Sequence, residues 1–170
     1  MYCMNILKNF KAITTFVFDM DGVLTDGTLL IFKGTEWLRK MNIKDGYALQ
    51  LAAKQNYRVV ILSKSNSDPV KERLHSLGVK EVFMKVPDKR EKLQAYIAEN
   101  KLNPAEVLFM GDDVPDYTCM QIAGLPCCPS DAVSDIKNVA KYISPFKGGE
   151  GCARDVIEKV LKLHGKWPME

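Results

Sequence analysis

Short apolar runs alternate with segments of helical periodicity along most of the chain, and this alternation constrains the fold most strongly. Predicted strands occupy residues 13–18, 57–62, 81–84, 107–110, 125–128 and 142–143. Predicted helices occupy residues 47–55, 69–77, 88–100, a segment through Met120 that ends at Gly124, 132–139 and 152–163. Strands that alternate with helices form a mostly parallel sheet covered on both faces. The sequence therefore predicts an α/β fold with a Rossmann-like, doubly wound parallel sheet.

One insertion interrupts this alternation after the first strand. Residues 28–32 and 35–38 read as two short strands around Lys33-Gly34, which predicts a β-hairpin at about 28–38. Lys44-Asp45-Gly46 reads as a turn. The chain has 170 residues and no repeat or long linker, so we expect a single domain over residues 1–170.

Charge and cysteine content exclude several classes of function. The net charge is +3 without a long run of like charges, which argues against nucleic acid as a partner. Neither a membrane span nor the apolar core of a signal peptide is found. Five cysteines without Cys-x-x-Cys spacing argue against a zinc site or a disulfide framework. Buried free thiols in a reducing cytoplasm are the expectation.

The first sign of chemistry is the pair Asp19 and Asp21, which follows the first predicted strand and precedes Gly22. A parallel sheet delivers such residues to its ligand-binding edge. Two carboxylates this close repel each other unless a cation or a proton lies between them. A calcium loop of the EF-hand type is excluded, since its glycine and glutamate positions hold Leu24 and Leu30.

Further polar residues follow other core strands. Ser63 follows the strand at 57–62, and Lys89 opens the helix after the strand at 81–84. Asp112 and Asp113 follow the strand at 107–110, with Asp116 close behind. Singly, each has an ordinary interpretation as a helix cap or a solvated residue. Together at one sheet edge they suit phosphoryl transfer, in which carboxylates attack, protonate and bind Mg²⁺ while a hydroxyl and a lysine hold the phosphate.

These residues resemble the four motifs of the haloacid dehalogenase superfamily, in the order of that family. The motifs are Asp19-Met20-Asp21-Gly22-Val23, Ser63, Lys89 and Gly111-Asp112-Asp113-x-x-Asp116. The resemblance implies that Asp19 is a nucleophile that forms an aspartyl-phosphate and that Asp21 is the general acid and base.

The same resemblance implies a Mg²⁺ site and a phosphate site. Asp19, Asp112 and the backbone carbonyl of Asp21 would bind Mg²⁺. Asp113 and Asp116 would support these ligands from the second layer of residues around the ion. Ser63 and Lys89 would hold the phosphate. Many relatives carry a cap domain over the site, but the intervals 22–62 and 64–88 are each shorter than a domain of about 50 residues. We therefore expect a capless enzyme.

A subgroup is indicated by the hairpin, Asp45-Gly46, the missing cap and a tail at about 148–170 that begins Gly148-Gly149-Glu150-Gly151-Cys152-Ala153-Arg154. These features resemble the capless phosphatases of 3-deoxy-D-manno-octulosonate 8-phosphate and of nine-carbon keto-sugar acid 9-phosphates. The resemblance implies a cytoplasmic step in making lipopolysaccharide or related surface sugars. It also implies a homotetramer in which the tail of one subunit closes the next site, so that Gly149, Gly151 and Arg154 would bind substrate. A plain loop with a solvated arginine is the alternative for this tail.

The chain departs from the subgroup at Ser63-Lys64-Ser65, where the usual pattern is Thr-Gly-Arg. Relatives that act on nine-carbon substrates often carry glutamate in place of the arginine, at the position of Ser65. Lys64 and Ser65 are the residues expected to face the rest of a small phosphorylated sugar acid. A phosphotransferase and a non-catalytic interaction domain remain as alternative functions. The first normally needs a cap, and the second is disfavoured by the retention of Asp19, Asp21, Lys89 and Asp112.

Overall fold

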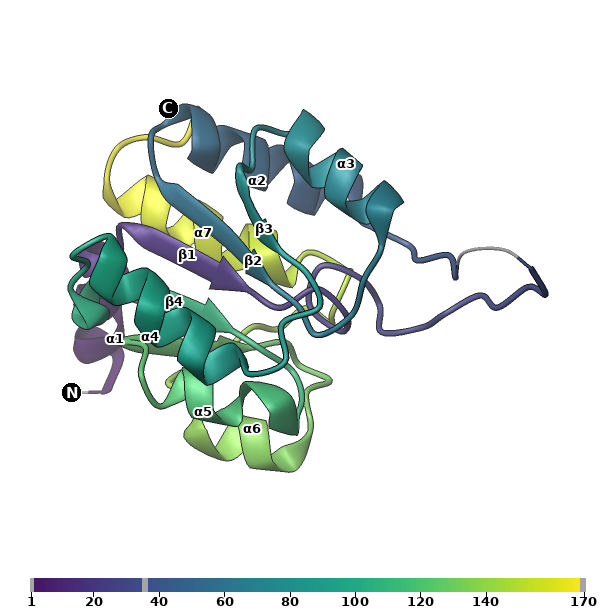
Figure 1. The fold of residues 1–170 in the computed structure, drawn as a ribbon. Coiled ribbons are helices and arrows are strands. Elements are labelled where there is room, and N and C mark those ends of the chain that lie inside the picture. The colour runs from purple at the N-terminus through teal and green to yellow at the C-terminus, as the bar shows by residue number, and fades with distance from the viewer. Residues whose placement is uncertain (1, 35–36, 169–170) are drawn as a thin grey trace.

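A single six-stranded parallel sheet lies at the centre of the molecule (Figure 1). The computed structural model describes residues 2–34 and 37–168, with side chains from Ile6 onward. The strand order is β3-β2-β1-β4-β5-β6. The strands are β1 (Thr15–Phe18), β2 (Arg58–Leu62), β3 (Glu81–Phe83), β4 (Val107–Met110), β5 (Leu125–Cys128) and β6 (Tyr142–Ile143). The predicted α/β architecture with a parallel sheet is confirmed, and every predicted core strand is present.

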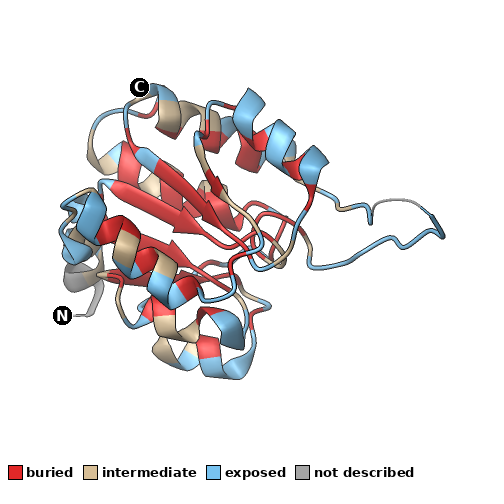
Figure 2. Cartoon of the chain, in the orientation of Figure 1, coloured by how far each residue is buried: buried red, intermediate tan, exposed pale blue. Residues whose placement is uncertain are grey.

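Helices cover both faces of this sheet, because its central strands are apolar on both sides (Figure 2). Phe16 and Phe18 of β1 pack among α1, α2, α3 and α7, whereas Val17 points to the opposite face beside α4, α5 and α6. The helices are α1 (Tyr2–Ala12), α2 (Ile43–Lys54), α3 (Asp68–Ser76), α4 (Lys89–Glu99), α5 (Tyr117–Met120), α6 (Ser134–Val139) and α7 (Cys152–Leu163), with 3-10 turns η1 (Pro104–Glu106) and η2 (Val114–Asp116).

The sheet places β1 at the point where the strand order reverses. β1 pairs with β2 on one side and with β4 on the other, both in parallel register. The backbone nitrogen of Asp19 donates to the carbonyl of Met110 at 3.0 Å, so the ends of β1 and β4 stay together. In open α/β sheets this is where ligands bind.

One helix was missed, and two local predictions were wrong. The N-terminal helix α1 was not predicted, yet Phe10 is buried and packs edge-on against Tyr142 at 5.1 Å between ring centroids. The predicted turn at residues 44–46 lies inside α2, whose start is capped by the Asn42 side chain accepting from the Lys44 backbone nitrogen at 2.8 Å. The single helix expected through Met120 is divided into η2 and α5.

Residues 28–34, 37 and 38, here called the arm, extend away from the sheet (Figure 1). Isolated antiparallel bridges join Leu30 to Leu38 and Thr25 to Met41. The described part of the arm contains isolated bridges but no continuous strand, so the prediction of two full strands is wrong there. Thr35 and Glu36 of the second predicted strand lie outside the described residues. The arm exposes large apolar side chains, with Ile31 at 64% and Phe32 at 56%.

The expectation of buried free thiols is confirmed for four of the five cysteines. These are Cys119, Cys127, Cys128 and Cys152, whereas the side chain of Cys3 lies outside the described set. Within residues 2–34 and 37–168, the helices are all too short or too polar to cross a membrane.

Candidate active site

A cleft of about 280 Å³ opens at the carboxyl ends of β1, β2 and β4. Three motif-bearing loops meet there because the parallel strands all end at this edge. The cleft is lined by Asp19, Asp21, Gly27, Ser63, Lys64, Ser65, Lys89, Asp112, Asp113, Pro115 and Asp116. The structure therefore brings together nine of the residues selected from the sequence.

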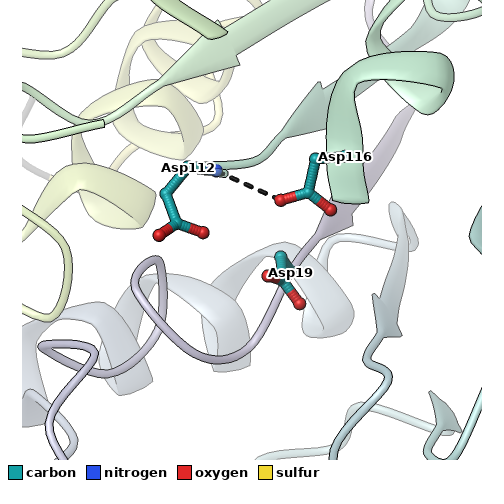
Figure 3. A group of neighbouring side chains, drawn as sticks. All are labelled: Asp19, Asp112 and Asp116. Atoms are coloured by element: carbon teal, nitrogen blue, oxygen red, sulfur yellow. Dashed lines mark hydrogen bonds between the residues drawn. The ribbon is translucent and has the colours of Figure 1, made fainter. Parts of the chain in front are cut away.

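Lys89 connects two of the carboxylates at the floor of the cleft. Its Nζ lies 2.7 Å from Oδ1 of Asp19 and 2.7 Å from Oδ1 of Asp116. The other Asp116 oxygen accepts from the backbone nitrogen of Asp112 at 3.1 Å (Figure 3). Lys89 is buried at the start of α4, where Asp88 caps the helix through the backbone nitrogen of Glu91. A buried ammonium held this way has a fixed position.

Electrostatics in this cluster favour an added cation. Burial and the charge of Asp116 raise the pKa of Asp19 to about 8, although Lys89 opposes the shift. Burial and the charges of Asp116 and Asp113 raise the pKa of Asp112 to about 7. Burial lowers the pKa of Lys89, but the charges of Asp19 and Asp116 more than offset this, so its net pKa shift is upward. The carboxylates outnumber the one lysine that neutralises them.

The donor set fits Mg²⁺. Carboxylate oxygens of Asp19, Asp112 and Asp116 lie within 4.8 Å of one another and point into one space (Figure 3). Hard oxygen ligands of this kind suit Mg²⁺. Both oxygens of Asp116 already accept hydrogen bonds, from Lys89 and from the backbone nitrogen of Asp112. Asp116 is therefore suited to hold its neighbours in place. Asp19 and Asp112 would then hold the ion directly.

The backbone at Gly22 passes directly beside the Asp112 carboxylate. Gly22 adopts a φ of +86°, a conformation that favours glycine. A Cβ atom at this position would collide with the carboxylate of Asp112. Glycine therefore allows the loop after β1 to approach Asp112 closely.

Arg39 is a site residue that sequence reasoning missed. Its Nε donates to Oδ1 of Asp21 at 2.7 Å, and its Nη2 donates to Oδ2 at 3.3 Å. Arg39 directly follows the arm, 18 positions after Asp21, and no strand end or helical spacing marks it in the sequence. The signal that was present is a single arginine in the chain segment that returns from the arm to the site.

Ser63, Lys64 and Ser65 form the rim contributed by β2. Ser63 is buried, and its Oγ accepts from the backbone nitrogen of Ser65 at 3.1 Å. The Ser63 backbone also bonds to Phe83 at 2.9 Å, which joins the rim to β3. Lys64 is exposed and Ser65 is half-buried. This rim presents one cation and two hydroxyls near the cleft.

The glycines of the tail approach the loop after β1 from outside the cleft. The Gly149 backbone nitrogen donates to the Val23 carbonyl at 2.9 Å, and a Cβ on Gly149 would lie 2.6 Å from the backbone nitrogen of Asp26. A Cβ on Gly148 would collide with the Gly22 carbonyl. The close backbone approach expected from these glycines is therefore made to the chain's own loop.

Gly151 and Arg154 also lie outside the cleft within one chain. Their backbone nitrogens donate to the buried Asp45 carboxylate, at 3.1 Å and 2.7 Å. The Arg154 side chain pairs with Glu158 at 3.0 Å and stacks over Trp167 at 5.2 Å. Of the sequence-selected residues that the structure describes, Gly149, Gly151 and Arg154 are the ones not brought into the site, and their action on a neighbouring subunit stays a prediction.

The known proteins that this chain resembles are hydrolases of one family. A model of haloacid dehalogenase-like hydrolases matches residues 75–155. The structure resembles that of a probable YrbI family phosphatase from Pseudomonas syringae, with 32% identity, a TM-score of 0.91, and coverage of 96% of this chain and 93% of that one.

Two further relatives are phosphatases of one sugar acid. The 3-deoxy-D-manno-octulosonate 8-phosphate phosphatase of Salmonella typhi is 27% identical over 162 residues, covering 95% of this chain and 86% of that protein. The enzyme of that name from Moraxella catarrhalis, solved with magnesium, phosphate and the sugar acid, aligns with a TM-score of 0.89 at 26% identity, over 94% and 91% of the two chains. With its parallel sheet and its motif residues in one cleft, the chain belongs to the haloacid dehalogenase-like hydrolases.

Proposed function

We propose that this chain is a Mg²⁺-dependent phosphatase that hydrolyses a small sugar-acid phosphate through an aspartyl-phosphate on Asp19. The observation that supports this most is the arrangement on the cleft floor. Asp19 lies 2.7 Å from the ammonium of Lys89, and its carboxylate lies within 4.8 Å of that of Asp112. A carboxylate held beside a lysine and a cation site is suited to attack an anionic phosphate, because both neighbours offset charge repulsion.

The proposed reaction has two displacements. An oxygen of Asp19 attacks phosphorus, the bond to the sugar oxygen breaks, and Asp21 gives that oxygen its proton. Asp21 then takes a proton from a water molecule, which attacks the phosphorus of the aspartyl-phosphate and releases inorganic phosphate and free Asp19.

The remaining residues would hold the transferring group. Lys89 and the Ser63 hydroxyl would bind phosphate oxygens, while Asp113 and Asp116 would keep the cluster in place. Asp113 is suited to this because its side chain accepts from the Val114 backbone nitrogen at 2.7 Å and caps η2. When bound by Asp19, Asp112 and the Asp21 carbonyl, Mg²⁺ supplies charge neutralisation for the phosphate.

For the substrate we propose 3-deoxy-D-manno-octulosonate 8-phosphate first, and a nine-carbon keto-sugar acid 9-phosphate as its main competitor. The names of the two sugar-acid phosphatases support the first choice. Ser65 lies in the cleft without the charge of an arginine or a glutamate, so Lys64 is the cation available at this rim. A lysine recognises a carboxylate as a point charge, with less geometric restriction than arginine.

We further propose a single hydrolase domain over residues 1–170 that works as a cytoplasmic homotetramer. The exposed apolar side chains of the arm support self-association, since a free surface rarely exposes so many together. Gly149, Gly151 and Arg154 would act in this assembly on the neighbouring cleft.

The test of the mechanism is Asp19→Asn. The variant keeps its shape and loses the nucleophile, so hydrolysis of p-nitrophenyl phosphate falls by at least about a thousandfold, with an unchanged circular dichroism spectrum. Wild-type turnover by the variant would refute the mechanism. The substrate is then identified by ranking phosphorylated sugars and keto-sugar acids by kcat/KM with the wild-type enzyme.

A further inference from the structure

Arg39 follows the arm directly, and its side chain is held in one place and buried. It lies between the Leu30–Leu38 bridge and the Thr25–Met41 bridge, so the backbone is held on both sides of it. Its side chain is 4% exposed, whereas that of the next residue, Lys40, is 80% exposed. Arginine is almost never buried unless it is paired. The fold therefore directs the Arg39 side chain inward.

The partner of Arg39 is the Asp21 carboxylate, held at both oxygens. Besides the contacts of Nε and Nη2 with Asp21, the Nη1 of Arg39 donates to the Trp37 carbonyl at 3.3 Å. A guanidinium that contacts both oxygens of a carboxylate restricts its rotation as well as its position. Thr25 adds only a long contact of 3.5 Å to the same carboxylate. Arg39 is thus the main determinant of the direction in which Asp21 points.

Arg39 does not itself line the cleft, although Asp21 does. The guanidinium lies behind the carboxylate and is shielded from solvent. Each carboxylate oxygen accepts hydrogen bonds from two directions, so the contact with Arg39 leaves a side of each oxygen for a reacting group. Any influence of Arg39 on the reaction must therefore pass through Asp21.

We propose that Arg39 is a positioning residue that aims the Asp21 carboxylate at the leaving oxygen of the substrate. The inference rests on the proposed function, in which Asp21 transfers the proton. It also links the arm to the chemistry, because the chain that carries Arg39 is the chain that returns from the arm.

The test compares leaving groups in the variant Arg39→Met. A sugar alkoxide is a poor leaving group and needs its proton from Asp21, whereas p-nitrophenolate leaves with little help. We expect kcat/KM, which reports the steps up to release of the sugar and not the later hydrolysis of the aspartyl-phosphate, to fall about ten- to a hundredfold for 3-deoxy-D-manno-octulosonate 8-phosphate or for the panel sugar phosphate with the highest kcat/KM. The kcat/KM for p-nitrophenyl phosphate falls less than about threefold.

Two variants serve as controls. Lys40→Met removes an exposed cation from the same segment, where its nearest carboxylate is Asp26 at 3.9 Å, and it keeps wild-type values. Arg39→Lys retains the charge without the two-point contact, so it recovers part of the loss on the sugar phosphate only. If Arg39→Met fails to fold, Arg39→Lys alone carries the comparison of leaving groups.

The double variant Asp21→Asn/Arg39→Met tests whether the effect passes through Asp21. We expect it to be as slow as Asp21→Asn alone, because a positioning residue has nothing left to position. The proposal is overturned if Arg39→Met lowers kcat/KM for both substrates equally, or lowers that of Asp21→Asn by its full factor. If Asp19→Asn remains active, the proposed function fails; if it is inactive while Arg39→Met matches the wild type on both substrates, only this inference fails.

Discussion

Replacing Asp45 by alanine is expected to destabilise the protein through the start of α7. The residue that precedes this helix, Gly151, has no side chain to cap it. Asp45, from α2, supplies the cap instead, since its carboxylate accepts from the backbone nitrogens of Gly151 and Arg154. Asp45 is only 2% exposed, so water cannot easily replace its carboxylate.

The magnitude follows from those two hydrogen bonds. A bond to a charged acceptor contributes about 1.5–3 kcal/mol, and loss of a helix cap costs about 0.5–2 kcal/mol. Burial works against the carboxylate and raises the pKa of Asp45, which reduces the net gain. We expect Asp45→Ala to lower the free energy of unfolding by about 3 kcal/mol, which corresponds to a fall in Tm of about 6–12 °C for a chain of this size.

Urea unfolding followed by circular dichroism, together with thermal melts, measures this loss. Asp45→Asn keeps one acceptor oxygen and is expected to lose about half as much. Asp135→Ala is the matched control, because Asp135 is an exposed acidic residue in the first turn of α6 and changes stability by less than about 0.5 kcal/mol. If the Asp45→Ala curve coincides with that of Asp135→Ala, the capping argument is refuted.

Two further predictions concern the metal and the arm. EDTA is expected to abolish hydrolysis, and added Mg²⁺ to restore it. In the metal-free protein, the pKa of Asp19 is raised to about 8, so the folded state keeps a proton that the unfolded state has released. Tm therefore falls as pH rises from about 6 to 8.5. Added Mg²⁺ raises Tm more at the upper end of this range, because it competes with that proton, and a flat Tm profile in EDTA would contradict the assignment. Ile31→Glu places a charge on the exposed arm and is expected to convert the proposed wild-type tetramer into monomers, as measured by light scattering. A wild-type protein that is already monomeric at micromolar concentration would disprove this role of the arm.

The strands and their polar ends were predictable because they depend on local pattern and on one topological rule. The apolar runs that end at Phe18, Leu62 and Met110 predict buried parallel strands, and parallel strands bring the residues after them to one edge. Asp19, Ser63 and Asp112 therefore meet in the cleft whatever the details of packing. Lys89 follows the same rule from the start of α4.

Contacts that depend on the path of a loop were not predictable. Arg39 reaches Asp21 only because the arm turns back at the Leu30–Leu38 bridge, which no periodicity records. The turn expected around Asp45 became the first turn of α2, because Asn42 caps that helix. Glycines signal close approach but not the partner, so the sequence did not reveal that Gly149 lies against the backbone of Asp26 in its own chain.

The contact between the tail and Val23 has a consequence for the order in which the protein matures. The Val23 carbonyl accepts from the Gly149 backbone and from the Cys152 thiol, which is 129 positions further along the chain. During synthesis, the Asp19–Asp21 segment emerges early but acquires these supports only after α7 has left the ribosome. These contacts therefore form only once the segment from Gly149 to Cys152 has been made, and a chain that stops before residue 149 has Asp19 and Asp21 without the support for the loop that follows them.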